Sequence, residues 1–118
     1  MASLSRRAKG KRGEDLAAQA LTQMGYQIRV RNWRCALGEI DLIAQKGDDL
    51  VLIEVRARSE GTDTALETFS ARKRARMLAL AEAYLDSCES PPASIRIDVV
   101  VVDLRSGAVE VIEHALGW

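Results

Sequence analysis

The sequence predicts an α/β protein in which a mixed β-sheet is flanked by α-helices. Two observations lead to this prediction: two segments carry apolar residues at helical spacing, and the other ordered segments have the short apolar patterns of strands. Along the chain the elements follow the order helix, three strands, helix, two strands. The 118 residues suffice for one domain with its own core. We therefore expect a basic, flexible arm over residues 1–10 and a single domain over residues 11–118.

The N-terminal part of the domain contains the first helix and the first strand. A helix is expected over residues 11–24, because apolar side chains recur at helical spacing from Leu16 to Met24. Gly25 is a suitable residue to end it. A strand is expected over residues 26–34, where apolar and polar residues alternate.

The next two strands, residues 38–45 and 49–57, are expected to form a hairpin. Gly47-Asp48 between them is a pair typical of tight turns. With this pair at the centre of the turn, the numbers of facing residues sum to 95. One face of the hairpin is then wholly apolar and consists of Ile40, Leu42, Ala44, Val51, Ile53 and Val55.

The other face of this hairpin carries charge. The same register places Asp41 opposite Glu54, and Glu39 opposite Arg56. Like charges that face each other across two strands destabilise a sheet. A divalent cation such as Mg²⁺, which takes carboxylate ligands, would offset this repulsion. The alternative is a solvated face on which Arg56 pairs with Glu39, and a slip of one residue in the register would exchange the two faces.

The second half of the chain contains one helix and two strands. A loop is expected over residues 59–64, followed by a helix over residues 66–87 that ends before Ser90-Pro91-Pro92. Residues 95–103 form a strand so apolar in its second half that both its faces are expected to be covered. A short final strand is expected over residues 108–112.

Composition excludes several classes of function. No apolar run reaches the length of a membrane span, and no secretory signal is present, so a cytoplasmic protein is expected. Cys35 and Cys88 are isolated and His114 is the only histidine, which argues against a zinc site or a Cys–His nucleophile. Net charge is zero, but basic residues gather in residues 6–12 and 72–76. This distribution indicates local anion-binding patches.

Several motifs together resemble the YraN family, small bacterial proteins of uncertain function assigned to the restriction-endonuclease-like PD-(D/E)XK superfamily. The resemblance covers about residues 8–114 and rests on Gly13-Glu14, Arg31-Asn32-Trp33-Arg34, Gly38-Glu39-Ile40-Asp41-Leu42-Ile43 and Glu54-Val55-Arg56-Ala57-Arg58. The nearest functional relatives of the family are archaeal Holliday-junction resolvases. The resemblance implies a restriction-endonuclease-like sandwich and metal-dependent hydrolysis of phosphodiester bonds in DNA.

Carried over residue by residue, Asp41 matches the metal-binding acid of the superfamily and Glu54 the acid of its D/E-X-K triplet. The resemblance implies that these two acids and the Val55 carbonyl hold Mg²⁺ or Mn²⁺. Glu14 matches the helical acid that resolvase-like members add. Glu39 is read either as an acid that supports the metal ligands from outside or as the partner of Arg56.

Arg56 stands where the triplet has a lysine. An arginine keeps its proton at neutral pH and cannot act as a general base, but it can stabilise charge that develops on a phosphate. Lys73 of the following helix is a candidate for the missing ammonium group. The replacement of lysine by arginine at this position affects the expected activity more than the expected fold.

The basic residues expected to contact DNA are Arg6, Arg7, Lys9, Lys11, Arg12, Arg58, Arg72 and Lys73. The first hypothesis is a Holliday-junction-resolvase-like endonuclease that cuts structured or branched DNA. The alternative is a catalytically impaired nucleic-acid-binding or adaptor protein with the same fold, and the third is an interaction module. Because a junction is two-fold symmetric, a homodimer is also expected. Neither a membrane nor a small-molecule cofactor is expected as a partner.

Overall fold

The computed structural model contains the predicted elements in the predicted order, and it describes residues 5–58, 71–90, 92 and 94–115. The α/β fold class is confirmed. None of the helices within these ranges is long and apolar enough to cross a membrane. The elements are α1 (Arg6–Gln23), β1 (Gln27–Cys35), β2 (Gly38–Lys46), β3 (Asp49–Arg58), α2 (Ala71–Ser87), β4 (Ser94–Asp103) and β5 (Val109–Ile112).

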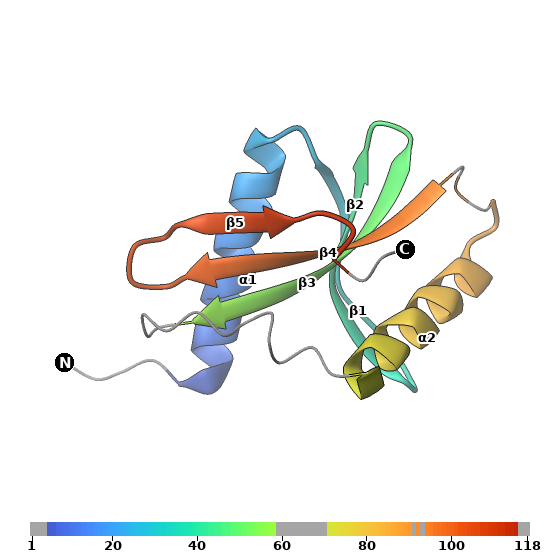
Figure 1. Cartoon of the computed structure of the whole chain (residues 1–118), viewed down its shortest axis with the longest axis horizontal. Coiled ribbons are helices and arrows are strands. Elements are labelled where there is room, and N and C mark those ends of the chain that lie inside the picture. Colours follow the sequence, from blue (N-terminus) through green and yellow to red (C-terminus); the bar gives the residue numbers. More distant parts are fainter. Residues whose placement is uncertain (1–4, 59–70, 91, 93, 116–118) are drawn as a thin grey trace.

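The strands form one five-stranded sheet with the order β1-β2-β3-β4-β5 (Figure 1). Neighbouring strands are antiparallel except β3 and β4, which are parallel. Parallel neighbours need a crossover connection, and α2 lies within the connection between these two strands. The mixed sheet predicted from the sequence is therefore confirmed.

Helix α1 begins before its predicted start at residue 11. The Ser5 hydroxyl accepts a 3.1 Å hydrogen bond from the Ala8 amide, which caps the helix and extends it back to Arg6. Residues 6–10 are thus helical, and the predicted helix start at residue 11 is wrong; the flexibility of the arm stays a prediction, and residues 1–4 lie outside the described part. At its other end the helix stops before Gly25, which has φ +95°, as predicted.

The second half agrees with its predicted elements wherever it is described. Helix α2 ends at Ser87 as predicted, while residues 66–70 of the predicted helix and the predicted loop at residues 59–64 lie outside the described part. In strand β4, Ile97–Val102 are all buried, which confirms that both faces of this strand are covered.

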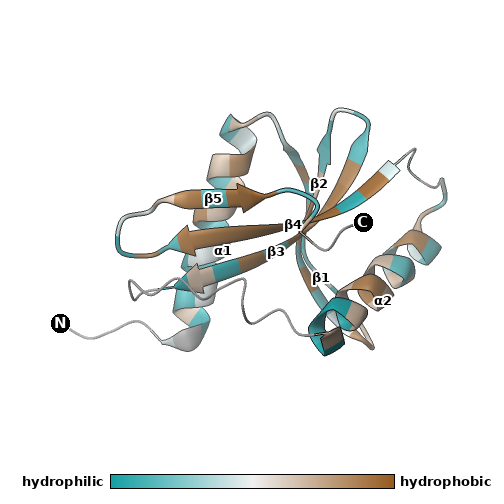
Figure 2. Ribbon diagram, viewed as in Figure 1, coloured by the Kyte–Doolittle hydropathy of each residue, from teal (hydrophilic) through white to brown (hydrophobic). Residues whose placement is uncertain are grey.

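Two apolar clusters, one with each helix, fill the two sides of the sheet. The α1-side core contains Ala17 and Leu21 of α1 with the fully buried Leu42, Ala44, Val51, Ile53, Val100 and Val102. The α2-side core contains Met77, Leu80 and Ala81 of α2 with Ile40, Ile43, Leu50, Leu52 and Ile97. Figure 2 shows β3 and β4 as apolar along most of their length. Both faces of the sheet therefore need a covering layer, as a sandwich requires.

The register of the β2–β3 hairpin is the predicted one near the turn. The pairs run from Lys46–Asp49 to Leu42–Ile53, and in each pair the two numbers sum to 95 as expected. The pairing ends there, so the predicted facing pair of Asp41 is not part of the ladder.

Strand β2 changes faces at Asp41. Leu42 packs in the α1-side core and Ile40 in the α2-side core, although residues two apart on a regular strand share a face. The prediction that these two residues lie on one apolar face is wrong. Strand β1 is irregular at the same level, because Asn32 has φ +56° and lies between the partners of Leu42 and Ile40. Asn is one of the few residue types that adopt this conformation readily.

A buried polar network lies beyond the C-terminal end of α1. Arg96 is 7% exposed and Asp98 is fully buried, and Nε of the arginine lies 3.2 Å from Oδ1 of the aspartate. The Tyr26 hydroxyl accepts a hydrogen bond from Arg96 (2.9 Å) and donates one to Asp98 (3.3 Å). Arg96 also forms ion pairs with Asp49 and Glu113. The network joins β3, β4 and the segments that follow α1 and β5.

Candidate metal centre

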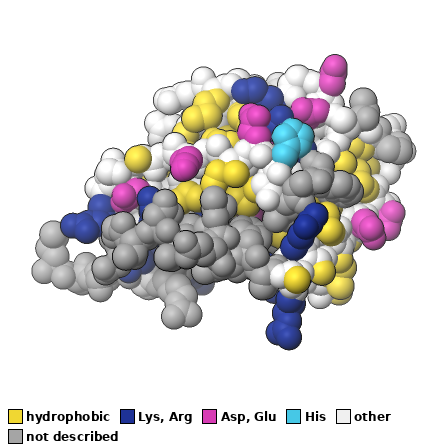
Figure 3. Space-filling view, viewed as in Figure 1, with side chains coloured by type: hydrophobic (Ala, Val, Ile, Leu, Met, Phe, Trp, Pro, Cys, Tyr) yellow, Lys and Arg dark blue, Asp and Glu magenta, His cyan; other side chains and the backbone are white. Residues whose placement is uncertain are grey.

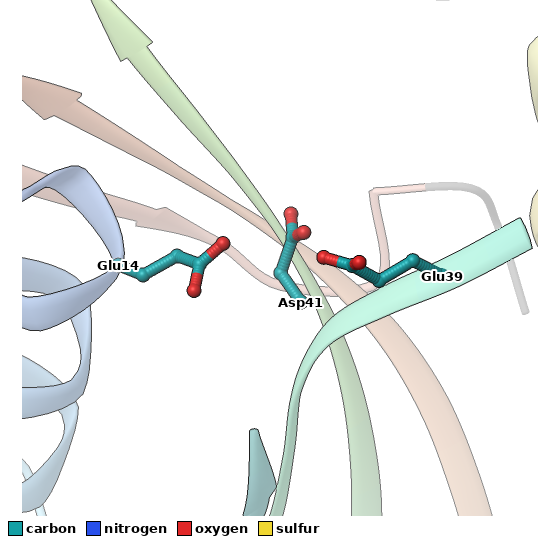
Figure 4. A group of neighbouring side chains, drawn as sticks. All are labelled: Glu14, Glu39 and Asp41. Atoms are coloured by element: carbon teal, nitrogen blue, oxygen red, sulfur yellow. The ribbon is translucent and has the colours of Figure 1, made fainter. Parts of the chain in front are cut away.

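Three carboxylates from two elements meet at the face switch of β2. Glu14 comes from α1, and Glu39 and Asp41 come from β2; their side chains point toward one another (Figure 4). One oxygen of each residue lies within 4.8 Å of the others, and all three side chains are partly buried. Hard divalent cations take oxygen ligands at such clusters. We refer to Glu14, Glu39 and Asp41 as the acid cluster.

The approach of α1 to the sheet places Glu14 in the acid cluster. A Cβ atom on the preceding residue, Gly13, would lie only 2.7 Å from Cβ of Ala57 on β3. Only glycine therefore allows the helix to lie this close to the strand. The neighbouring glutamate consequently reaches across to Asp41 from the helix.

Asn32 is a member of the site that sequence reasoning did not assign. Its side chain favours the charged form of Glu14 and so lowers the pKa of that acid, although burial is the stronger effect and raises it overall. The left-handed backbone of Asn32 is part of the same irregularity that turns Asp41. The sequence did contain one signal for this irregularity, because asparagine tolerates positive φ and here lies inside an otherwise regular strand pattern.

Asp41 has the most perturbed carboxyl group of the site. Its Oδ2 accepts a 2.8 Å hydrogen bond from the Val55 amide, which favours the charged form. Burial disfavours the charged form more strongly than this bond favours it. The negative charges of Glu14, Glu54 and Glu39 act in the same direction as burial, so the pKa of Asp41 rises to about 7. A carboxyl group of this kind is stabilised as an anion by a bound cation.

The sequence-predicted acid Glu54 is near the acid cluster but outside it. Its Oε1 lies 3.8 Å from Nε of Arg56 and 4.0 Å from Nζ of Lys73 on α2. Its Oε2 is buried and accepts no hydrogen bond from the described residues. The structure thus gives Glu54 two cationic neighbours, one of them the lysine singled out as a candidate ammonium group.

Glu39 has a different partner from the one that the hairpin register predicts. It pairs with Arg34 of β1, with 2.7 Å between Nε and Oε2, rather than with Arg56. Pairing between β1 and β2 brings these residues opposite each other, and the face switch at Asp41 separates Glu39 from β3. Glu39 also belongs to the acid cluster, and its ion-pair partner is Arg34 where the sequence predicted Arg56.

Two hollows adjoin the acid cluster. The acid hollow, about 570 Å³, is lined by Lys9, Gly10, Glu14, Asp41, Val55, Arg56 and Ala57. The arginine hollow, about 510 Å³, is lined by Arg7, Gly10, Lys11, Glu14, Arg31, Asn32, Arg34 and Glu39. Both include Gly10 and Glu14, which lie one turn apart on the same side of α1. The two hollows are therefore neighbours on either side of this part of the helix.

The structure divides the basic residues predicted to contact DNA. Arg7, Lys9 and Lys11 line the hollows. Arg12 instead donates a 2.6 Å hydrogen bond to the Leu104 carbonyl, which ties α1 to the end of β4. The others lie at the start of α1 (Arg6), at the end of β3 (Arg58) and on α2 (Arg72, Lys73). Among the described residues, Lys and Arg side chains are scattered over the face seen in Figure 3, which offers no continuous basic surface there.

Comparison with known proteins places this geometry in a family. A model of the uncharacterised protein family UPF0102 matches residues 13–102 of the chain. The chain belongs to this family. It is 46% identical to a UPF0102 protein of Moorella thermoacetica, over 96% of this chain and 98% of the relative. It is 42% identical to a UPF0102 protein of Chloroflexus aurantiacus, over 94% of this chain and 92% of the relative. A UPF0102 protein of Streptomyces griseus is 43% identical, over 96% of this chain and 97% of the relative.

The segment matched by the UPF0102 model includes the acid cluster and Glu54. The resemblance to the YraN family, another name for UPF0102, is therefore confirmed. In this UPF0102 chain the site offers a group of partly buried carboxylates beside guanidinium groups. Such an arrangement suits a divalent cation together with an anionic ligand.

Proposed function

We propose that this protein is a metal-dependent endonuclease that hydrolyses phosphodiester bonds in structured or branched DNA. The observation that carries the proposal is the acid cluster, whose three carboxylates converge in a partly buried site. Unpaired buried charge is costly, and a divalent cation would supply the compensating charge. The resemblance to PD-(D/E)XK nucleases supports two members of this cluster, Asp41 and Glu14, and adds the substrate.

In this proposal, Asp41 holds Mg²⁺ or Mn²⁺ with Glu14 and Glu39, and Glu54 and the Val55 carbonyl complete the set expected from the superfamily. A bound ion would lower the pKa of its water and polarise the scissile phosphate. Arg56, which lines the acid hollow, contacts the phosphate and stabilises its developing charge. Lys73, whose Nζ lies 4.0 Å from Oε1 of Glu54, is the candidate for the ammonium group that the triplet lacks.

The direct test is a calorimetric titration of the full-length protein with Mg²⁺ and Mn²⁺, combined with cleavage assays on branched, flap and linear DNA. Asp41→Asn is expected to abolish both metal binding and cleavage. The matched control is Glu110→Gln, which removes an exposed acid on β5 and should leave both unchanged. Absence of metal binding by the wild type would contradict the proposal.

A second function, a catalytically impaired nucleic-acid-binding or adaptor protein, is favoured by Arg56. This arginine and Lys73 both lie near Glu54, so this acid has cationic neighbours without a metal ion. Metal and DNA binding without cleavage would support this reading. Gain of cleavage in Arg56→Lys would then identify the lysine as the missing group.

We further propose a homodimer, because two active sites are needed to cut a two-fold symmetric junction. Sedimentation of the protein alone and with a four-way junction tests this expectation. A dimer that binds neither metal nor DNA would instead favour the interaction module.

A further inference from the structure

The arginine hollow has a lining that differs from that of the acid hollow. Four of its residues are cationic: Arg7 and Lys11 of α1, and Arg31 and Arg34 of β1. They come from two elements that lie on either side of the hollow. The hollow therefore presents donors to a bound anion from more than one direction.

Acidic neighbours hold these cations in place. Arg31 lies 2.6 Å and Lys11 3.1 Å from the two carboxylate oxygens of Asp15. An arginine side chain has five N–H donors, and this pair uses one nitrogen of Arg31, so other donors stay available. Asp15 therefore lies beside two of these cations and leaves part of their hydrogen-bonding capacity for a bound anion.

Among the described residues, no side chain separates the two hollows at Gly10 of α1. A Cβ atom added to this glycine would meet no atom within 4 Å, so the space above it is open. Glu14, one helical turn further along, lines both hollows. An extended anionic chain can thus pass from the acid cluster over Gly10 into the arginine hollow.

We propose that the arginine hollow binds the backbone phosphate adjacent to the scissile phosphate on the same DNA strand. This inference rests on the proposed function for the position of the scissile phosphate. It assigns a substrate-positioning role to Arg31 and Arg34, which the sequence did not indicate. Guanidinium groups suit this role because they bind phosphate oxygens with two parallel hydrogen bonds.

The pair between Arg34 and Glu39 links this subsite to the metal. Glu39 belongs to the acid cluster and lies 2.7 Å from Arg34. A cation that engages Glu39 weakens this ion pair and releases the arginine to the phosphate. Metal binding and phosphate binding therefore favour each other, and the coupling must be reciprocal.

Fluorescence anisotropy tests the subsite with a fluorescein-labelled DNA duplex, in Ca²⁺ to allow binding without turnover. The double variant R31Q/R34Q is expected to bind more weakly, with the slope of log K against log salt reduced by about one, because one phosphate contact is lost. The matched control is Arg29→Gln, which removes an exposed arginine of β1 that does not line the arginine hollow. The full-length protein is used throughout.

An unchanged slope in the double variant, an equal loss in Arg29→Gln, or no DNA binding by the wild type would each overturn the subsite. The proposed hydrolysis is tested separately. If the wild type binds DNA through Arg31 and Arg34 but neither binds Mg²⁺ nor cleaves, the phosphate subsite is supported and the hydrolysis is contradicted. For the coupling, Ca²⁺ should tighten DNA binding by the wild type more than by Arg34→Gln. If Ca²⁺ tightened DNA binding equally in the wild type and in Arg34→Gln, the proposed coupling through the Arg34–Glu39 ion pair would be contradicted.

Discussion

The backbone amide of Val55 donates a 2.8 Å hydrogen bond to the Asp41 carboxylate, across two strands at the point where their regular pairing ends. The donor is a main-chain group, so no substitution at Val55 other than proline removes it. The orientation of the central acid is consequently set by the backbone of the sheet. This explains how a carboxyl group can be held in a partly buried site before any ligand arrives.

Metal affinity should depend on pH through Asp41. Its pKa of about 7 means that at lower pH a proton must leave before a cation binds. We expect Mg²⁺ affinity to rise about tenfold per pH unit on the acid side of this value and to level off above it. Calorimetry in two buffers of different ionisation enthalpy should detect proton release near pH 6. A pH-independent affinity would contradict this assignment.

The same shift should make Asp41 a source of instability in the metal-free protein. The folded-state pKa is raised, so the folded state binds the proton more tightly, and this group's contribution to stability is lost as pH rises from about 4 to about 7. Asp41→Asn keeps an acceptor for the Val55 amide but cannot ionise. In EDTA at about pH 8 it should raise the free energy of unfolding by about 1–3 kcal/mol, measured by urea denaturation. A neutral or negative effect would count against a buried charge here.

The two glycines of α1 should respond in opposite ways to alanine. Gly13→Ala places a methyl group 2.7 Å from Cβ of Ala57 and should cost about 1–3 kcal/mol through overpacking. Because the helix must move, Glu14 should also leave the acid cluster and metal affinity should fall. Gly10→Ala meets open space and should stabilise the helix by about 1 kcal/mol. Thermal denaturation of both variants, with and without Mn²⁺, measures the contrast; similar effects would disprove the close contact.

Glu39 and Glu54 should differ as metal ligands. Glu39 has an oxygen within 4.8 Å of those of Glu14 and Asp41, whereas Glu54 lies beside Arg56 and Lys73. Glu39→Gln is therefore expected to weaken Mn²⁺ binding more than Glu54→Gln does. Titration of each variant with Mn²⁺ compares them directly. If Glu54→Gln weakened Mn²⁺ binding more than Glu39→Gln, the result would support Asp41 and Glu54, the ligand pair predicted from the hairpin register.

The Arg96 network should be a large contributor to stability. Asp98→Ala leaves a buried guanidinium without its fully buried carboxylate partner, at a cost of about 3–5 kcal/mol. Tyr26→Phe removes only a hydroxyl that bonds to both groups, so about 1–2 kcal/mol is expected. Chemical denaturation of the two variants gives the comparison. If Asp98→Ala were the milder change, the ion pair would not be the main element of the network.

Much of the fold could be predicted from local patterns. The hairpin register followed from one turn pair, because Gly47 and Asp48 fix which residues face each other. The start of α1 was missed because its first turns are basic and carry no apolar stripe, while the Ser5 cap depends on a single side chain. Apolar periodicity finds the buried part of a helix but not the part that extends into solvent.

The site was only partly predictable, for a physical reason that concerns strand geometry. Register arithmetic assumes that a strand keeps its alternation, whereas β2 changes faces at Asp41 beside the left-handed Asn32. That change brings Glu39 and Asp41 to Glu14, and Glu39 pairs with Arg34 instead of Arg56. Arg96 and Asp98 were also missed, because a charged pair within an apolar strand can be recognised only when both partners are seen to be buried.

The parallel pairing of β3 with β4 also determines when the site can form during synthesis. The acids lie between residues 14 and 54, but β4, which supplies the buried Val100 and Val102 beneath α1, begins only at Ser94. A growing chain that ends before β4 therefore has every carboxylate but lacks the Val100 and Val102 part of the layer against which α1 packs. A fragment that stops after Arg58 is accordingly expected to carry the acids without forming the metal centre.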